Sequence, residues 1–251
     1  MGALNNGTST TFMRLGHEGR TEEVVRRMIE VIELGVFAEG EQLPSESELA
    51  QQFGVATVTL REALAVLRQR GLIETRRGRK GGSFIRAPRE VSQTALLERL
   101  RQMSLMELRD LGDELAAIST ATARLAARRA TTEHHVRLRH QVEALGNAAT
   151  RLERRRADAH FHIEIAVASQ SVRLTNTQMR LQAEVGELFW IDSADTPDIA
   201  AIQRQQRALL DALEAGDVQL AGELAEAKVT RSIKRLINLR LEQLAEEEID
   251  G

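Results

Sequence analysis

The sequence contains no cysteine. This absence excludes disulfide bridges, thiolate metal sites and a cysteine nucleophile. The first residues, from Met1 to Arg20, lack the apolar core of a signal peptide and are expected to form a mobile polar arm. No apolar run approaches the length of a membrane span. We therefore expect no membrane partner, and a cytoplasmic location follows by elimination.

The remaining composition is typical of a folded, soluble chain. Hydrophobic residues make up 42% of the 251 residues and charged residues 28%, which is enough apolar material for a core. The length suits one large domain or two ordinary ones. The net charge is only -3 and says nothing by itself about nucleic acid, so the distribution of charge along the chain is more informative.

Basic residues gather between Arg68 and Arg89. Eight lysines and arginines stand there against a single acid, Glu74. An isolated charge run of this kind is usually a solvated face. Because this one follows a helix-turn-helix pattern, we interpret it as a phosphate-binding surface.

Residues 21–88 have the pattern of a winged helix-turn-helix. A capping box of Ser45 with Glu48 marks the start of the second helix, and Gly54 permits the tight turn before the third. After Gly71, two strand-like runs flank a basic, glycine-rich turn. The expected elements are helices over 21–34, 46–53 and 57–70 and strands over 72–76 and 83–86.

The rest of the chain contains no convincing strand. Amphipathic helical patterns follow one another from about Val91, and Gly216 with Asp217 is typical of a helix stop followed by a cap. Such a series indicates an antiparallel bundle. Phe189 and Trp190 are expected in its core or in a dimer interface. The expected helices cover 91–101, 104–129, 132–148, 150–170, 172–194, 197–215 and 217–247.

These patterns together predict a mainly α protein. An N-terminal winged helix-turn-helix with a small β-hairpin wing precedes a C-terminal all-α antiparallel helical bundle. The expected divisions are a flexible arm at 1–20, a DNA-binding domain at 21–88 and a helical domain at 89–251.

The recognition helix of a helix-turn-helix enters the major groove with its first residues leading. Here those residues include Thr57, Thr59 and Arg61. A threonine hydroxyl can contact a phosphate or a base edge, and Arg61 can clamp a guanine or a phosphate with two hydrogen bonds. The alternatives are that Arg61 pairs on the surface with Glu62 or Glu48 and that the two threonines cap the helix.

The wing carries the second set of candidate DNA contacts, Arg77, Gly78, Arg79 and Lys80. Glycine lets the backbone approach DNA closely, and the cations can enter the adjacent minor groove. Two-fold DNA sites need two reading heads, so we expect a homodimer on double-stranded DNA.

Residues 43–64, 70–73 and 77–85 resemble the DNA-binding domain of the GntR family of transcription regulators. The resemblance implies that the start of the recognition helix and the tip of the wing contact a palindromic operator. The DNA-binding residues expected on this basis are Ser45, Ser47, Thr57, Thr59, Arg61, Arg77, Gly78, Arg79 and Lys80.

This chain departs from the family pattern at two places. Ser47 stands where the family usually has arginine, and Ala56 with Thr57 stands where it often has a Ser-Arg pair. Each change removes a phosphate or base contact. The usual operator sequence of the family therefore need not apply to this chain.

Residues 125–131, 158–162 and 207–217 resemble the all-helical FCD effector domain of the FadR subgroup. Many members hold a divalent metal with one aspartate and three histidines. The matching positions here are Asp158 and His162, spaced four residues apart on one helix face, and then Gln206 and Lys228. The resemblance implies an effector pocket at these four residues, and repression that is relieved by ligand as the commoner pattern.

Three interpretations of this pocket stay open at the sequence level. In the first, the Lys228 ammonium replaces the metal, pairs with Asp158, hydrogen-bonds His162 and attracts a carboxylate effector, such as an organic acid. In the second, the pocket is degraded and binds no ligand. In the third, Asp158 and His162 hold zinc, nickel or manganese with a further group such as His160. For His162 alone, the plain alternative is a core histidine.

The sequence therefore predicts a homodimeric, ligand-responsive transcription regulator, most simply a repressor. One alternative is an architectural DNA binder that responds to no ligand. Another is an enzyme using Asp158 and His162 as acid and base. No nucleophile elbow, phosphate loop or HExxH motif accompanies these residues, so we expect the protein not to be an enzyme.

Overall fold

The computed structural model describes residues 20–35, 37, 39–78, 81–86, 91–193 and 198–250, except for the side chains of 248–250. The chain divides into two compact units, Met1–Arg89 and Glu90–Gly251. No helix of the described residues combines the length and the apolar character needed to cross a membrane.

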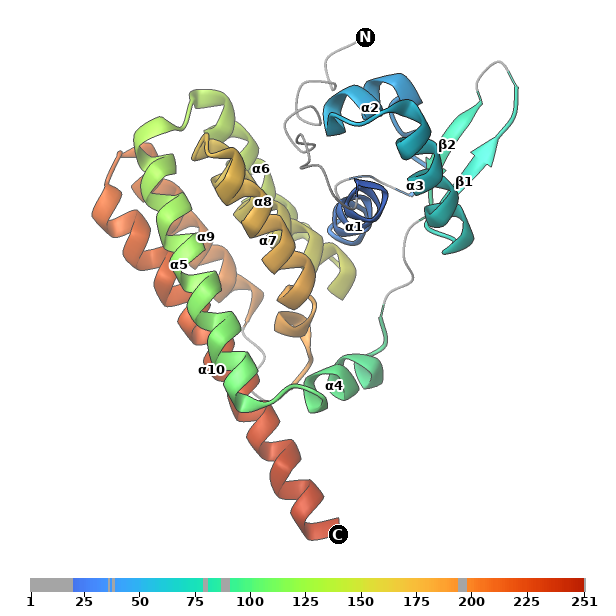
Figure 1. Ribbon diagram of the computed structural model, residues 1–251. Helices are drawn as coiled ribbons and strands as arrows, with labels where there is room; N and C mark the ends of the chain where they lie inside the picture. The colour runs from blue at the N-terminus through green and yellow to red at the C-terminus, as the bar shows by residue number, and fades with distance from the viewer. Residues whose placement is uncertain are drawn as a thin grey trace. The chain divides into compact units, whose positions relative to one another are not determined.

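The described residues of the first unit form three helices followed by a two-stranded sheet (Figure 1). Its strands pair antiparallel, with Ile73 opposite Ile85 and Arg76 opposite Gly82. This confirms the predicted winged helix-turn-helix. The elements are α1 (Arg20–Glu33), α2 (Glu46–Phe53), α3 (Thr57–Gln69), β1 (Ile73–Arg76) and β2 (Gly82–Ile85).

Local sequence explains how the helix-turn-helix forms. The predicted capping box is present, because the backbone N–H of Ser45 donates to Glu48 Oε2 at 2.8 Å and the N–H of Glu48 donates to Ser45 Oγ at 3.3 Å. Gly54 ends α2 with φ 66°, in the left-handed region that favours glycine. Apolar residues at helical spacing predict an inward face for α3, and its members Leu60, Ala63, Leu64 and Leu67 are buried.

The regular elements described in the second unit are all helices, which confirms the predicted all-α bundle (Figure 1). Helices α5 and α10 are long neighbours that run in opposite directions, and α7 packs between α6 and α8. The elements are α4 (Gln93–Arg101), α5 (Leu105–Arg129), α6 (Thr132–Asn147), α7 (Arg151–Ala168), α8 (Val172–Val185), the 3-10 turn η2 (Leu188–Trp190), α9 (Ile199–Glu214) and α10 (Val218–Asp250).

One predicted helix is wrong in extent. The pattern predicted a single helix over 172–194, but α8 ends at Val185 and the 3-10 turn η2 follows. Gly186 is a poor helix former, and the four residues Leu188, Phe189, Trp190 and Ile191 are all buried. Four consecutive side chains of a regular helix point around its whole circumference, so a change of backbone path is needed to bury them all. The predicted start of the helix over 197–215 lies outside the described residues.

Candidate functional site

The start of α3 presents the candidate DNA-reading residues to solvent. Thr57 and Arg61 are exposed, Val58 is 62% exposed, and Thr59 is half-buried. The N-cap residue is Ala56, which makes no side-chain cap. The alternative that a threonine caps this helix is therefore wrong. The first backbone N–H groups of α3 are left for another acceptor, and a phosphate is the acceptor that a helix N-terminus favours.

Arg61 forms an ion pair that the sequence did not reveal. Its Nε lies 2.6 Å from Glu46 Oε2, and the two side chains are 66% and 42% exposed. Neither expected partner is used: Glu48 belongs to the capping box, and Glu62 accepts a hydrogen bond from the Thr21 hydroxyl at 3.0 Å. The guanidinium is therefore presented to solvent while a neighbouring carboxylate orients it.

The two serines at the start of α2 differ in their hydrogen bonds within the protein. The Ser45 hydroxyl donates to Glu48 Oε2 at 2.7 Å and lies 3.1 Å from Ser47 Oγ. Its role in holding the start of α2 is thus established by geometry, whereas contact with DNA stays a prediction for both serines. Ser47 is exposed.

The wing places Arg77 and Gly78 in exposed positions after β1. Gly78 has φ 119°, which side chains rarely allow, and its carbonyl accepts from the Gly81 N–H at 2.8 Å to close the turn. Arg76 is used within the wing, since its guanidinium stacks 4.2 Å from the Phe84 ring centroid. Arg79 and Lys80 lie outside the described residues.

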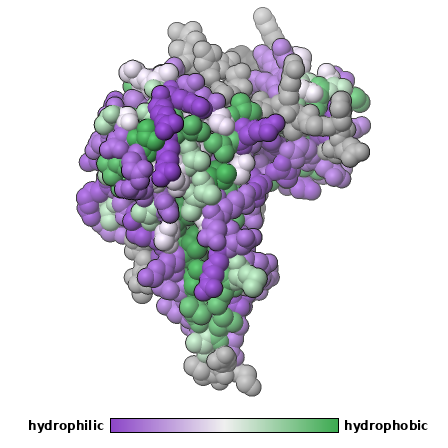
Figure 2. Space-filling view, turned by 60° about the vertical axis from the view of Figure 1, so that its left-hand side comes forward, coloured by the Kyte–Doolittle hydropathy of each residue, from purple (hydrophilic) through white to green (hydrophobic). Residues whose placement is uncertain are grey.

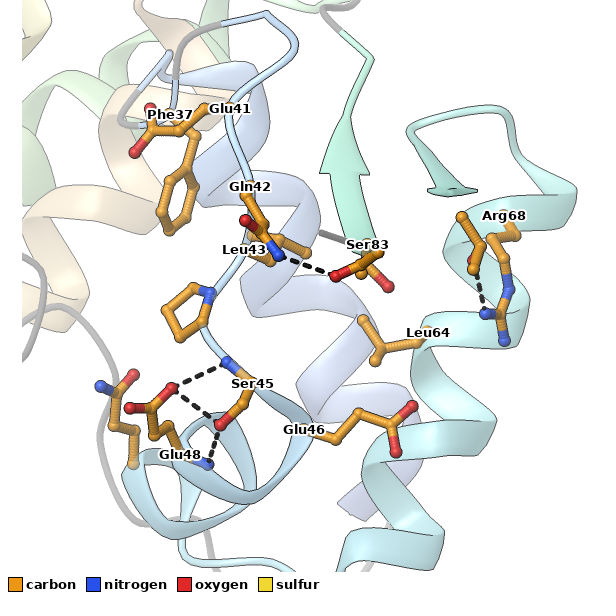
Figure 3. Close-up of a pocket in the computed structure, with 15 residues that line it drawn as sticks. Phe37, Glu41, Gln42, Leu43, Ser45, Glu46, Glu48, Leu64, Arg68 and Ser83 are labelled. Atoms are coloured by element: carbon orange, nitrogen blue, oxygen red, sulfur yellow. Dashed lines mark hydrogen bonds between the residues drawn. The ribbon is translucent and has the colours of Figure 1, made fainter. Parts of the chain in front are cut away.

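A cavity of about 900 Å³ opens in the first unit between the loop before α2, helix α3 and β2 (Figure 3). No sequence pattern predicted this cavity. Three carboxylates, Glu41, Glu46 and Glu48, line it against one guanidinium, that of Arg68. The Arg68 Nη1 also donates to the Thr75 hydroxyl at 3.0 Å. This excess of negative charge disfavours phosphate, so the cavity is a poor candidate for the DNA backbone.

The second unit gathers the four residues predicted for the effector pocket. Gln206 Nε2 donates to Asp158 Oδ1 at 3.0 Å, Lys228 Nζ lies 3.4 Å from Asp158 Oδ2, and His162 Nε2 lies 3.4 Å from Asp158 Oδ1. Helix α7 supplies Asp158 and His162, α9 supplies Gln206 and α10 supplies Lys228. The Asp158, His162 and Gln206 residues are buried, and the Lys228 side chain is 15% exposed.

Electrostatics fix the charge states in this cluster. Burial raises the pKa of the Asp158 carboxyl, but Lys228 and His162, which is protonated in the acidic range where Asp158 titrates, outweigh burial and hold this pKa well below its usual range. Burial and the Lys228 ammonium lower the pKa of His162 more than Asp158 raises it. At neutral pH the cluster therefore holds one carboxylate and a neutral imidazole beside the lysine.

A cavity of about 110 Å³ adjoins Asp158 and Lys228. Among the described residues that line it, Arg231 and Arg235 join Lys228 as cations, and Asp158 is the carboxylate. The buried Arg235 guanidinium donates to backbone carbonyls, among them that of Ile191 at 2.9 Å. The lining residues are Asp158, Phe189, Trp190, Ile202, Gln205, Lys228, Arg231, Ser232 and Arg235.

Sequence reasoning missed Arg231 and Arg235 at this cavity. A signal for them did exist, since positions 228, 231 and 235 follow the spacing of one helical face. Phe189 and Trp190 are buried in the core cluster, as predicted, but they also border the cavity. Their position at the cavity depends on the change of backbone path after Val185, which periodicity did not show.

Two family models match the chain. The one described as bacterial regulatory proteins, gntR family, matches residues 20–84, and the FCD domain matches residues 110–231. RmpR of Mycobacterium gastri, named as an HTH-type transcriptional regulator, is 39% identical over 226 residues, which are 88% of this chain and 82% of that protein. The chain belongs to the GntR family of bacterial transcription regulators.

Further similarities agree with this assignment. A regulator of Escherichia coli strain K12, named for the L-lactate dehydrogenase operon, is 31% identical over 205 residues, covering 78% of each chain. A GntR-family regulator from Pseudomonas syringae pv. tomato has a crystal structure with TM-score 0.51 and 17% identity, covering 96% of this chain and 94% of that one. At that identity the structural likeness shows the fold alone. The family identifies this GntR protein as a DNA-binding transcription regulator, not as an enzyme.

The metal that many FCD domains hold does not fit the residues present in this GntR protein. Asp158 and His162 are metal-ligand types, but Gln206 turns its amide donor toward Asp158 and the Lys228 ammonium has no lone pair. His160 lies two residues from Asp158 on α7, which places it about 200° around the helix axis and away from the cluster. Within the part of the chain that the structure describes, no three His, Cys, Asp or Glu side chains gather as a metal site.

Proposed function

We propose that this GntR protein is a ligand-responsive repressor that binds a palindromic operator as a homodimer and senses a small carboxylate. Residues 21–88 read DNA and residues 89–251 sense the ligand and dimerise. The observation that carries the ligand proposal is the cavity beside Asp158, whose described lining includes Lys228 and the exposed Arg231. A surplus of positive charge in a partly apolar cavity favours an anionic organic ligand.

The proposed operator contacts come from α3 and the wing. Arg61 is exposed and oriented, so it can exchange the Glu46 carboxylate for a guanine edge or a phosphate. Thr57 and Thr59 stand beside the open N–H groups of the α3 start, and Arg77 lies at the wing. With Ser47 in place of the arginine usual in the family, we expect fewer phosphate contacts and an operator that differs from the family's usual one.

Self-association is supported by apolar side chains left on the surface of the helical unit. Met106 at the start of α5 is 79% exposed, and Leu241 near the end of α10 is 47% exposed. These regions adjoin, because Arg240 Nε donates to the Met103 carbonyl at 3.2 Å. Figure 2 shows hydrophobic surface running down this unit toward the end of the chain. A second copy would cover such a patch and supply the second reading head.

The name of the Escherichia coli relative refers to an L-lactate dehydrogenase operon. Lactate is a small carboxylate, so a hydroxy acid of this size is a reasonable first ligand to test. A ligand in the helical unit can alter DNA binding only by as much as it prefers one arrangement of the reading heads over another.

The test uses the full chain and DNA selected by it from a random double-stranded library. We expect the selected sites to be palindromic, the complex to contain two chains by analytical ultracentrifugation, and L-lactate or another small carboxylate to weaken binding. Selected sites without symmetry, or one chain per site, would contradict the dimeric operator. A bound dimer whose affinity no small carboxylate changes would instead support the architectural alternative.

A further inference from the structure

The cluster around Asp158 already contains a cation of its own. The Lys228 Nζ lies 3.4 Å from Asp158 Oδ2, and it also lies 5.1 Å from the centroid of the Phe189 ring. A buried carboxylate is costly without a compensating charge. Since Asp158 is buried and the Lys228 Nζ lies beside its carboxylate, Lys228 is the side chain placed to supply this charge.

We propose that the Lys228 ammonium replaces the divalent metal of related effector domains and forms, with Arg231, a metal-independent site for the carboxylate of a small acid. This inference rests on the proposed ligand-responsive function. It assigns Lys228 two contacts: Asp158 on one side and the ligand on the other. Asp158 therefore has a cationic partner without a metal, and the lysine that provides it has no lone pair to offer a metal ion.

The geometry of Lys228 suits both contacts. An ammonium has three N–H donors and no acceptor. Asp158 Oδ2 takes one donor, and the 15% exposed side chain borders the cavity, where the remaining donors are available to a second carboxylate. The Arg231 side chain borders the same cavity and lies about one turn further along α10. A carboxylate bound there would meet two positive charges from one helix face.

The cluster also holds buried polar atoms that the described residues leave unsatisfied. His162 Nε2 and Gln206 Oε1 have no hydrogen-bond partner of good geometry there. Buried polar atoms are normally paired, so each calls for a further polar group or water. Both atoms can therefore form a hydrogen bond with a water or with a polar group of a bound ligand.

The cavity volume limits the size of the acid. A cavity of about 150 Å³ accommodates a benzene molecule, which has six heavy atoms. The present cavity of about 110 Å³ therefore suits an acid of roughly four to six heavy atoms, such as acetate or L-lactate. The ligand class is thus a short-chain carboxylate rather than a long-chain acyl compound.

The metal part of the proposal is tested with zinc alone. The full chain, purified without a metal-affinity tag and stripped with EDTA, is mixed with zinc, desalted and analysed for bound metal. We expect no stoichiometric zinc in the wild-type protein. The Gln206→His/Lys228→His variant removes the ammonium and adds two imidazoles beside Asp158 and His162, so we expect about one zinc per chain. The single variant Lys228→His serves as the backup if the double variant does not fold.

Two results would overturn the inference. One is stoichiometric zinc in the wild-type protein that is lost in Asp158→Asn, which would mean that the site holds a metal despite Lys228. The other is a folded histidine variant that binds no more zinc than wild type, which would mean that Lys228 does not stand where a metal could sit. Neither result depends on finding an effector or an operator.

The ligand part is read from the melting temperature in EDTA, with acetate and L-lactate compared against chloride at equal ionic strength. We expect a carboxylate to raise the melting temperature of the wild type and of Lys234→Met, an exposed lysine on the same helix, but not of Lys228→Met. A shift that survives in Lys228→Met overturns the role of Lys228. If no carboxylate shifts the melting temperature of any of these proteins, the carboxylate effector of the proposed function and the ligand part of this inference are both contradicted. A wild type free of zinc would in that case still support the metal part.

Discussion

The two units each contain a cation–carboxylate pair, and the pairs differ in burial. In the DNA-binding unit, Arg61 and Glu46 meet at 2.6 Å with side chains 66% and 42% exposed. In the helical unit, Lys228 and Asp158 meet at 3.4 Å with side chains 15% and 6% exposed. The shorter distance belongs to the pair that contributes less to stability, because water screens exposed charges strongly.

This contrast fits the roles proposed for the two pairs. An exposed pair can be exchanged at little cost when a phosphate or a base edge arrives, which is what a DNA-reading arginine requires. A buried pair cannot lose one partner without leaving a charge unsolvated. Burial therefore makes Asp158 and Lys228 permanent parts of the helical unit, whereas Arg61 stays available to a ligand.

Removing the buried cation has the largest expected effect. Lys228→Met leaves Asp158 buried without its main counter-charge, so we expect the free energy of unfolding to fall by about 3–5 kcal/mol. Urea unfolding measures this, with Lys234→Met as the exposed control on α10. A loss below about 1 kcal/mol, the range of exposed pairs, would remove the distinction between the two pairs.

A double variant distinguishes the contribution of the charges of Asp158 and Lys228 from the contribution of their packing. Asp158→Leu/Lys228→Met removes both charges, and we expect it to recover much of the stability lost in Lys228→Met, since replacing a buried pair by apolar residues is often neutral. Failure to recover stability would indicate that Gln206 and His162 need the carboxylate for their own placement.

Breaking the exposed pair of Arg61 and Glu46 should weaken operator binding and leave the stability of the fold nearly unchanged. Arg61→Ala is expected to cost about 1–3 kcal/mol of operator binding and to change the free energy of unfolding by less than about 0.5 kcal/mol. Fluorescence anisotropy with the selected operator measures binding. Glu46→Gln is the matched control, because it keeps the guanidinium and removes the competing charge, so its affinity should equal or exceed that of wild type. Unchanged affinity in Arg61→Ala would exclude Arg61 from the interface.

The same contrast explains what the sequence could and could not predict. The capping box of Ser45 and Glu48 and the inward face of α3 are local patterns, and the structure confirms both. The Arg61–Glu46 pair joins residues 15 positions apart across a turn, so spacing along one helix could not reveal it. The end of α8 depends on burying four consecutive apolar residues, which is decided by packing against other helices. Asp158 and Lys228, 70 positions apart, were associated only through the family resemblance.

The carboxyl of Glu164 tests whether burial or an ion pair determines the pKa of a carboxyl in this protein. Glu164 on α7 accepts a hydrogen bond from Arg137 Nε at 2.8 Å, yet burial outweighs this pair and raises its pKa to about 7. In the unfolded chain Glu164 has an ordinary pKa near 4.3. Between about pH 4.3 and about pH 7, Glu164 is therefore protonated in the folded protein and ionised in the unfolded chain. By linkage, this group's stabilisation is present below about pH 4.3 and is lost as the pH rises toward about 7.

The variant Glu164→Gln should remove that part of the pH dependence. We expect it to unfold with a free energy about 1–2 kcal/mol higher than wild type at pH 8 and nearly equal to wild type at pH 4. Urea titrations across this range measure the difference. Glu133→Gln is the control, because Glu133 contacts the same Arg137 at 3.1 Å but its side chain is 77% exposed. An identical pH dependence in wild type and Glu164→Gln would mean that the Arg137 pair, not burial, governs this carboxyl.

The smallest expected effect concerns the wing. Arg77 is exposed, so Arg77→Ala should leave the free energy of unfolding unchanged within about 0.5 kcal/mol. If its guanidinium neutralises one phosphate, the slope of log binding constant against log salt becomes less negative by about 0.9. Anisotropy titrations at several salt concentrations measure the slope, with Arg109→Ala, an exposed arginine of the helical unit, as the control. An unchanged slope would mean that counter-ion release comes from the start of α3 and from other basic residues, and that the exposed charge of Arg77 contributes no phosphate contact.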